Sequence, residues 1–158
     1  MMIIKAVEKI NNVELLLVGD GVNHSYLKKY VAKKNLKKKI KFIRQIDNSK
    51  YLKILKKYDI LILHTNASEF GKSVIEAMSL KKPIILNRPK FPIEELKNKF
   101  VFFSKNTVDD YKNSILYFIE NRHKIKEMGK NGYNIYKKKY NSNRLELKQK
   151  HLYSSALI

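Results

Sequence analysis

The stretch from residue 64 to residue 78 carries residue types suited to binding an anion. It passes from an apolar strand pattern through a turn at Gly71 into a helical pattern that begins near Lys72. The first backbone N–H groups of a helix lack intrahelical partners and attract anions, and the Lys72 ammonium adds a positive charge. We therefore predict an anion site formed by Gly71, Lys72 and Ser73.

Glu76 is the one charged residue in the apolar run 74–78 of the same predicted helix. Burying a carboxylate is unfavourable unless hydrogen bonds compensate it. An ionised carboxylate can accept hydrogen bonds from two sugar or ribose hydroxyls at once. The alternative is that Glu76 lies at the edge of the helix and pairs with a nearby lysine. The pattern alone leaves both interpretations open.

No cluster of side chains indicates a metal ion or a cofactor. The chain has no cysteine, which excludes disulfides and thiolate ligands. The four histidines are His24, His64, His123 and His151. They do not have the spacing of metal ligands, and no group of Asp or Glu residues accompanies them. We therefore predict no metal site and no cofactor. Asp109 and Asp110 are interpreted as residues that favour the start of their helix.

The candidate residues must be positioned by alternating strands and helices. Short apolar runs predict strands at residues 13–18, 40–43, 59–64, 83–87 and 100–103. The spacing of apolar residues predicts helices at residues 3–11, 24–35, 48–58, 72–80 and 107–121, followed by lysine-rich, mostly helical sequence to about residue 152. This alternation indicates an α/β fold: a Rossmann-like parallel sheet with helices on both faces. In such sheets ligands bind at the carboxyl ends of the strands.

Length and composition favour one domain without a membrane anchor. The 158 residues, of which 44% are hydrophobic, suit a single domain over residues 1–158, with residues 141–158 as a C-terminal tail. No apolar stretch is long enough to span a membrane, and the first residues do not resemble a signal peptide. We therefore expect a cytoplasmic protein.

The chain is strongly basic: 34 Lys and Arg against 14 Asp and Glu give a net charge of +20. This charge either attracts phosphates, in a nucleotide, a nucleic acid or an anionic lipid, or forms a solvated lysine surface. Nucleic acid is disfavoured, because few of the basic residues are arginine, the residue that reads bases with paired hydrogen bonds. The arginines are Arg44, Arg88, Arg122 and Arg144. The tyrosines among lysines at residues 133–140 either pack on the domain or contact anionic lipid at the inner face of a membrane.

Five elements occur along the chain in a characteristic order: Gly19-Asp20-Gly21, Phe42, the strand 59–63, Glu69-Phe70-Gly71 with Glu76-Ala77-Met78, and Lys82-Pro83-Ile84-Ile85. From about residue 3 to residue 140 this pattern resembles the C-terminal, donor-binding half of nucleotide-sugar glycosyltransferases of the GT-B type, group 1 or family 4. The Glu-Phe-Gly and Glu-Ala-Met elements are its most specific part. The resemblance implies one half of a GT-B fold, without the N-terminal acceptor domain.

The resemblance assigns roles to individual residues. In the family the second Glu of the motif holds the nucleotide ribose, which matches Glu76, and the first contacts the donor sugar, which makes Glu69 the candidate catalytic residue. Family members usually leave seven residues between the two glutamates, whereas Glu69 and Glu76 leave six. The remaining donor-binding residues that it implies are Phe70, Gly71, Lys72 and Ser73 at the sugar and diphosphate, and Gly19, Gly21 and Arg44 beside the base.

The resemblance also indicates what this sequence lacks. Relatives clamp the diphosphate with an Arg and a Lys on and just after a strand that precedes the helix 3–11, and this sequence contains neither that strand nor that pair. In the usual strand order the strand is central, between the strands 13–18 and 59–64. We therefore expect these two strands either to flank a gap or to close up. We also expect the isolated chain to be only marginally stable, unless another segment or chain supplies that strand by pairing with the exposed edges.

The function that these features predict is the binding of a nucleotide-sugar donor for glycosyl transfer. By resemblance, the transfer retains anomeric configuration and goes to a lipid-linked or polysaccharide acceptor. The expected partners are the donor and either an acceptor domain or a partner chain, with peripheral membrane contact. The alternative is a non-enzymatic basic module that binds nucleic acid or anionic membrane. Salt separates the two, because purely electrostatic binding weakens steeply with ionic strength.

Overall fold

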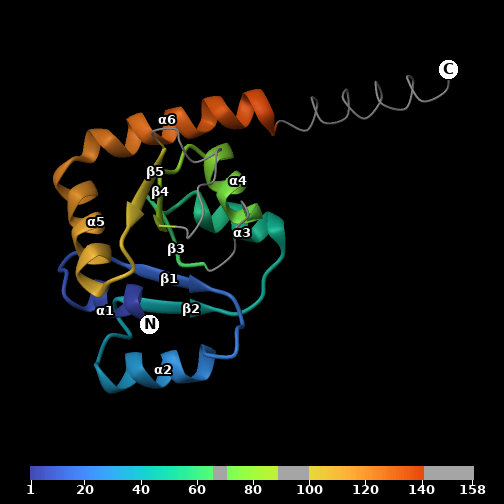
Figure 1. The fold of residues 1–158 in the computed structure, drawn as a ribbon. Helices are drawn as coiled ribbons and strands as arrows, with labels where there is room; N and C mark the ends of the chain where they lie inside the picture. The colour runs from blue at the N-terminus through green and yellow to red at the C-terminus, as the bar shows by residue number, and fades with distance from the viewer. Residues whose placement is uncertain (66–70, 89–99, 141–158) are drawn as a thin grey trace.

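The computed structural model describes residues 1–65, 71–88 and 100–140 of the chain. Helices and strands alternate along it (Figure 1). Their order is α1 (Met2–Glu8), β1 (Leu15–Val18), α2 (His24–Lys33), β2 (Ile40–Ile43), α3 (Asn48–Leu55), β3 (Leu61–Leu63), α4 (Lys72–Ser79), β4 (Ile84–Asn87), β5 (Val101–Ser104), α5 (Val108–Glu120) and α6 (Arg122–Lys139). The predicted elements are confirmed in type and order, with ends that differ by a few residues. The remainder of the lysine-rich helical prediction, and the tail 141–158, lie outside the described residues.

The strands form two separate parallel sheets. In the first, β1 pairs with β2, with Leu15 beside Ile40. In the second, the order is β3-β4-β5, with Leu61 beside Ile84. The predicted parallel α/β architecture is confirmed, but β1 and β3 do not pair with each other. These two strands were expected either to flank a gap or to close up, and in the structure they flank a gap.

Helices cover both faces of the strands, and each face has its own core. Side chains alternate between the two faces because the side-chain repeat of a strand is two residues. One core joins residues of both sheets to α1, α2 and α5, including Leu15, Ile40, Ile85, Ile4, Val31 and Tyr111. The other joins the β3-β4-β5 sheet to α3, α4 and α6, including Ile84, Leu86, Leu55, Val74 and Tyr136. The first core thus continues across the gap between the sheets, whereas the second lies mainly against one sheet.

The last two helices are placed by local features of the sequence. The Thr107 hydroxyl caps α5 by accepting a hydrogen bond of 3.0 Å from the Asp110 amide, and acidic residues occupy the first turn as predicted. In α6 a glycine allows close packing, because a Cβ at Gly129 would lie 2.0 Å from the backbone oxygen of Lys81. Helix α6 therefore lies directly on the end of α4.

The tyrosines of α6 pack on the domain, one of the two interpretations of this segment. Tyr136 and Tyr140 lie against the second core. The Tyr133 ring stacks on the Tyr136 ring, with 6.1 Å between the centroids, and the Lys81 ammonium lies 4.8 Å from the Tyr133 centroid. This part of the lysine-rich helix is therefore held by apolar and cation–π contacts.

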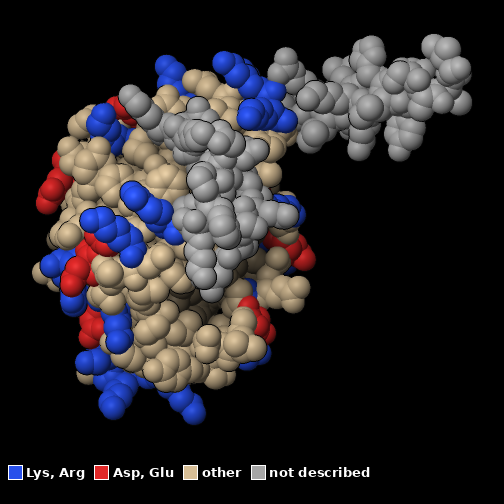
Figure 2. Space-filling model, in the orientation of Figure 1, with Lys and Arg blue, Asp and Glu red and all other residues tan. Residues whose placement is uncertain are grey.

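The positive charge is dispersed over the face of the molecule that Figure 2 shows. On the face shown in Figure 2, Lys and Arg side chains lie along α6 and over α2 and α5, with Asp and Glu among them, rather than in one dense patch. In the described part of the chain no helix has both the length and the apolarity needed to cross a bilayer. Nor does that part contain a group of three or more His, Cys, Asp or Glu residues placed to hold a metal ion.

Candidate functional site

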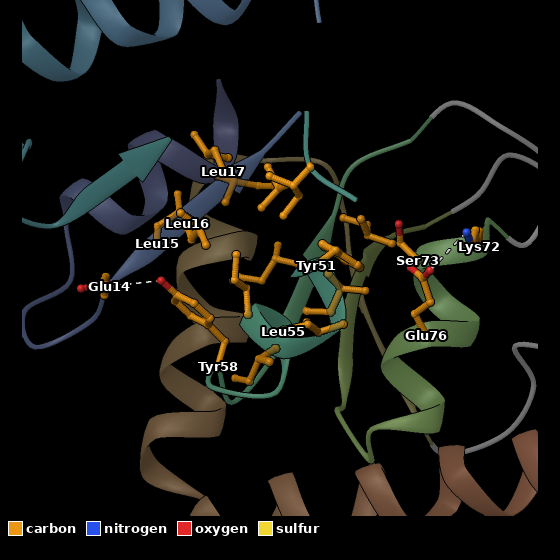
Figure 3. A pocket seen from close by; sticks show the side chains of 18 of the residues that line it. Glu14, Leu15, Leu16, Leu17, Tyr51, Leu55, Tyr58, Lys72, Ser73 and Glu76 are labelled. Carbon is orange, nitrogen blue, oxygen red and sulfur yellow. Dashed lines mark hydrogen bonds and ion pairs between the residues drawn. The ribbon is translucent and has the colours of Figure 1, made fainter. Parts of the chain in front are cut away.

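A cavity of about 480 Å³ lies between β1 and β3 and extends to the amino end of α4 (Figure 3). Its walls are the residues of both strands, and its lining is mainly apolar. Side chains of α3, with Tyr51 and Leu55 at the centre of the view, lie over one side of it. The polar side chains Lys72, Ser73 and Glu76 of α4 line the opposite end from Glu14 and Tyr58. The middle of the cavity is therefore lined by apolar side chains, and each of its two ends is lined by polar side chains.

Glu76 occupies the wall of this cavity with a poorly satisfied carboxylate. Its side chain is 11% exposed, and Oε1 is buried without a hydrogen-bond partner among the described residues. The Lys72 ammonium, one helical turn away, lies 3.7 Å from Oε1, which is an ion-pair distance rather than a hydrogen bond. Both interpretations of the sequence thus apply: Glu76 pairs with a lysine, and it still has an oxygen available to a hydroxyl donor.

The amino end of α4 has the features of an anion site. Gly71 is the N-cap residue, with an extended backbone, and no side chain of the described residues caps the helix. The first turn holds Lys72 and Ser73 and no acidic residue, so no carboxylate within that turn neutralises the partial positive charge of the helix end. The three residues predicted to form the anion site, Gly71, Lys72 and Ser73, therefore lie together at the amino end of α4. Lys72 and Ser73 line the cavity.

Tyr51 of α3 joins this group, although its sequence pattern does not mark it as a site residue. Burial raises the pKa of the Tyr51 hydroxyl, and this is the largest effect. The hydrogen bond with Ser73 lowers that pKa, and the negative charge of the Glu76 carboxylate raises it. The hydroxyl therefore lies close to both Ser73 and Glu76. At helical spacing among Leu52, Ile54 and Leu55, a tyrosine is typical of a core-facing residue, and nothing in the local pattern distinguishes it from one.

The predicted base-side residues form a separate group at the carboxyl ends of β1 and β2. Gly19 has a φ of +137°, a backbone conformation that L side chains rarely adopt, and its amide donates to the Ile43 carbonyl at 2.9 Å. The Arg44 guanidinium lies 3.6 Å from the Asp20 carboxylate, and Gly21 lies in the turn that follows. Among the described residues that line the cavity, none is Gly19, Gly21 or Arg44. The structure thus does not bring these three residues together with α4 in one cavity.

Glu69 and Phe70 lie outside the described residues, but the residues that directly follow β3, His64 and Thr65, are held by buried polar groups. The side chain of Asn87, at the end of β4, accepts a hydrogen bond from the Thr65 amide at 2.8 Å and donates one to the Thr65 carbonyl at 2.7 Å. The Tyr111 hydroxyl lies 3.0 Å from His64 Nδ1 and donates to the Leu63 carbonyl at 3.3 Å. Two distant elements, β4 and α5, therefore fix the point where the loop leaves β3.

Comparison with known proteins shows the family. A family model described as "Glycosyl transferases group 1" matches residues 2–135. An uncharacterized glycosyltransferase of Methanocaldococcus jannaschii is 27% identical over 124 residues, which is 77% of this chain and 35% of that protein.

Solved structures give the same fold. The HepE protein of Anabaena, in complex with UDP, is 21% identical with a TM-score of 0.80, over 98% of this chain and 44% of that one. Sucrose-phosphate synthase of Thermosynechococcus elongatus is 20% identical with a TM-score of 0.81, over 99% of this chain and 42% of that one. This chain thus spans less than half the length of these proteins. The likeness to these structures shows that the chain has the fold of one half of a GT-B enzyme. Because the family model matches most of its residues, the chain belongs to the glycosyl transferases of group 1.

Proposed function

We propose that the chain is the donor-binding part of a glycosyltransferase and binds a nucleoside diphosphate sugar beside α4. The observation that carries the proposal is the Glu76 carboxylate in the cavity wall, which has one buried oxygen that no described residue hydrogen-bonds. Two ribose hydroxyls would supply the missing donors. The start of α4, whose first turn holds no acidic residue, would then face the diphosphate. The fold neighbour from Anabaena, solved with UDP and with UDP-glucose, supports a ligand of this class.

The proposed reaction moves the sugar from the diphosphate to a hydroxyl of a lipid-linked or polysaccharide acceptor, with retention of configuration. The bond between the anomeric carbon and the diphosphate oxygen breaks, a bond to the acceptor oxygen forms, and the acceptor hydroxyl loses its proton. Lys72 and the first amides of α4 would stabilise the negative charge that develops on the leaving diphosphate. Glu69 is proposed to contact the donor sugar, and Gly19, Gly21 and Arg44 the base.

The acceptor side of the site is proposed to come from polypeptide outside this chain, as an acceptor domain or a partner chain. The fold neighbours support this, because this chain covers 44% or less of the two described above. A lipid-linked acceptor would place the assembly at the inner face of a membrane. The 158 residues would then bind the donor without transferring the sugar on their own.

The test is calorimetric titration of the chain with UDP and with GDP at low and at high salt. We expect saturable one-site binding of at least one diphosphate that keeps much of its affinity from about 0.05 to 0.5 M salt. A non-enzymatic basic module would instead bind DNA or anionic vesicles, with an affinity that falls steeply over the same range. Salt-sensitive binding to DNA or vesicles without saturable diphosphate binding would refute the proposal.

A further inference from the structure

A second cavity, of about 900 Å³, lies against β2, away from the amino end of α4. Among the described residues, β2 has β1 as its one strand neighbour, and Figure 1 shows β2 on the side of β1 that is remote from β3. The cavity is lined by all four residues of β2, by part of α2, and by the end of α3 with the turn that follows it. We call this cavity the edge groove.

The backbone of β2 presents an unpaired edge to the edge groove. The Lys39 and Ile43 carbonyls accept hydrogen bonds from β1 and from the residue after it. Successive residues of a strand direct their backbone groups to opposite edges, so the Ile40 carbonyl and both backbone groups of Phe42 point away from β1. Because residues of both faces of β2 line the groove, it extends along this outer edge. A strand edge of this kind is a template for an added strand.

The floor of the edge groove is apolar and incompletely packed. Leu16, Ile43 and Ile54 line it, and they are half-buried and belong to neither core cluster. Phe42, on the other face of β2, is half-buried as well. Covering the apolar surface that these side chains still expose would favour binding.

Lysines surround this apolar floor. The groove is lined by five of them, all exposed: Lys28, Lys29, Lys37, Lys41 and Lys57. Glu14 is the one carboxylate in its lining, and both of its oxygens are occupied, by hydrogen bonds of 2.8 Å from Lys41 and from the Tyr58 hydroxyl. Within the described part of the chain, no carboxylate pairs with the other four lysines. The groove is therefore complementary to a negatively charged partner.

We propose that the edge groove binds an extended, acidic segment of another protein, which pairs with β2 as an added strand and sets its carboxylates against the lysines. A peptide uses all three features of the groove: the free backbone groups, the apolar floor and the positive rim. A second copy of this chain is disfavoured, because the net charge of +20 makes two copies repel each other and lysines at a strand edge oppose pairing between like chains. The inference does not depend on nucleotide binding, since no residue of α4 lines the groove.

The probe is a synthetic peptide of four Val-Glu repeats with blocked ends, added to the whole chain and followed by NMR. At saturation we expect hydrogen exchange of the Phe42 amide to slow by about tenfold or more. The Lys41 amide, which already faces β1, should change by less than about twofold. One control peptide has Gln in place of Glu, and another has methyl groups on its backbone nitrogens, which removes every ladder donor. Each control should bind about tenfold more weakly or worse.

Two double variants test the lysines of the groove. In Lys28→Gln with Lys57→Gln, we expect the dissociation constant of the probe to rise about fivefold, the scale of losing two exposed ion pairs. The matched control is Lys33→Gln with Lys53→Gln, which makes the same change of charge at exposed positions of α2 and α3 outside the groove. Its effect should be less than about twofold. Equal weakening by the two double variants would mean that only net charge matters, and would refute the proposed site.

Five other results would overturn the inference. The first is exchange at Phe42 that is as slow as at Lys41 without probe, which would mean that the edge is already covered. The second is equal binding of the probe and either control peptide. The third is equal slowing of Phe42 exchange by single-stranded DNA or by vesicles of anionic lipid, which would assign the lysines to one of those partners. The fourth is slowing that accompanies dimerisation of the chain in sedimentation. The fifth is displacement of the probe by UDP, which would assign the groove to the nucleotide.

Discussion

Replacing Glu76 by alanine tests the site most directly. The substitution removes a carboxylate whose Oε1 is buried without a hydrogen bond and whose side chain is 11% exposed. If ribose hydroxyls donate to it, two hydrogen bonds to a charged acceptor are lost, which costs about 1–3 kcal/mol. We therefore expect the dissociation constant of the bound nucleoside diphosphate to rise about 5-fold to 150-fold.

The same change should leave stability nearly unaltered. The buried oxygen has a desolvation cost that its ion pair with Lys72, at 3.7 Å, compensates only in part. Alanine also has the higher helix propensity. We expect the free energy of unfolding in urea to change by less than about 1 kcal/mol.

The matched control is Glu127→Ala, which removes a glutamate of α6 whose side chain is 48% exposed and accepts a hydrogen bond from Lys124 at 2.7 Å. Calorimetry should show no effect of this control on nucleotide affinity. Unchanged affinity in Glu76→Ala, or an equal loss in the control, would refute the assigned role of Glu76. Destabilisation of Glu76→Ala by more than about 2 kcal/mol would instead identify Glu76 as a structural residue.

Four further predictions concern the scaffold of the site, each measured by urea unfolding. Gly129→Ala should destabilise the fold by about 2 kcal/mol or more, because its Cβ would lie 2.0 Å from the Lys81 carbonyl oxygen. In contrast, Gly132→Ala should cost less than about 1 kcal/mol, because its Cβ would meet Phe100 at an ordinary 3.4 Å and alanine favours the helix. Asn87→Leu should cost about 1–3 kcal/mol, because the buried backbone N–H and C=O of Thr65 lose their partner, and an equal stability would contradict the assigned pairing. Burial raises the pKa of Tyr111 to about 12, so deprotonation favours the unfolded state, whose tyrosine titrates near 10. Stability should therefore fall as the pH rises from about 10 to about 12, and Tyr111→Phe should reduce that fall.

The candidate site was predictable in part, for a physical reason. Lys72, Ser73 and Glu76 lie within one helix, so their spacing alone places them on neighbouring turns, and all three line the same cavity. Tyr51 comes from another helix and was missed, because a tyrosine at helical spacing has the pattern of a core residue. The predicted base-side group of Gly19, Gly21 and Arg44 lies apart from the cavity lining, because its position depends on how the two sheets are placed.

The sequence by itself determined the type and order of the elements and the parallel character of the sheets. Those properties follow from local periodicity: continuous apolar runs such as 84–86 make buried strands, and residues 72–79 repeat at helical spacing. The tertiary structure alone decided that β1 and β3 stay apart, that Asn87 holds the loop after β3, and that one oxygen of Glu76 is buried without a hydrogen bond. Each of these depends on which backbone edges and side chains meet across the chain. Which strands pair, and which polar atoms find a hydrogen-bond partner, are relations between distant residues, and the local patterns of this sequence do not encode them.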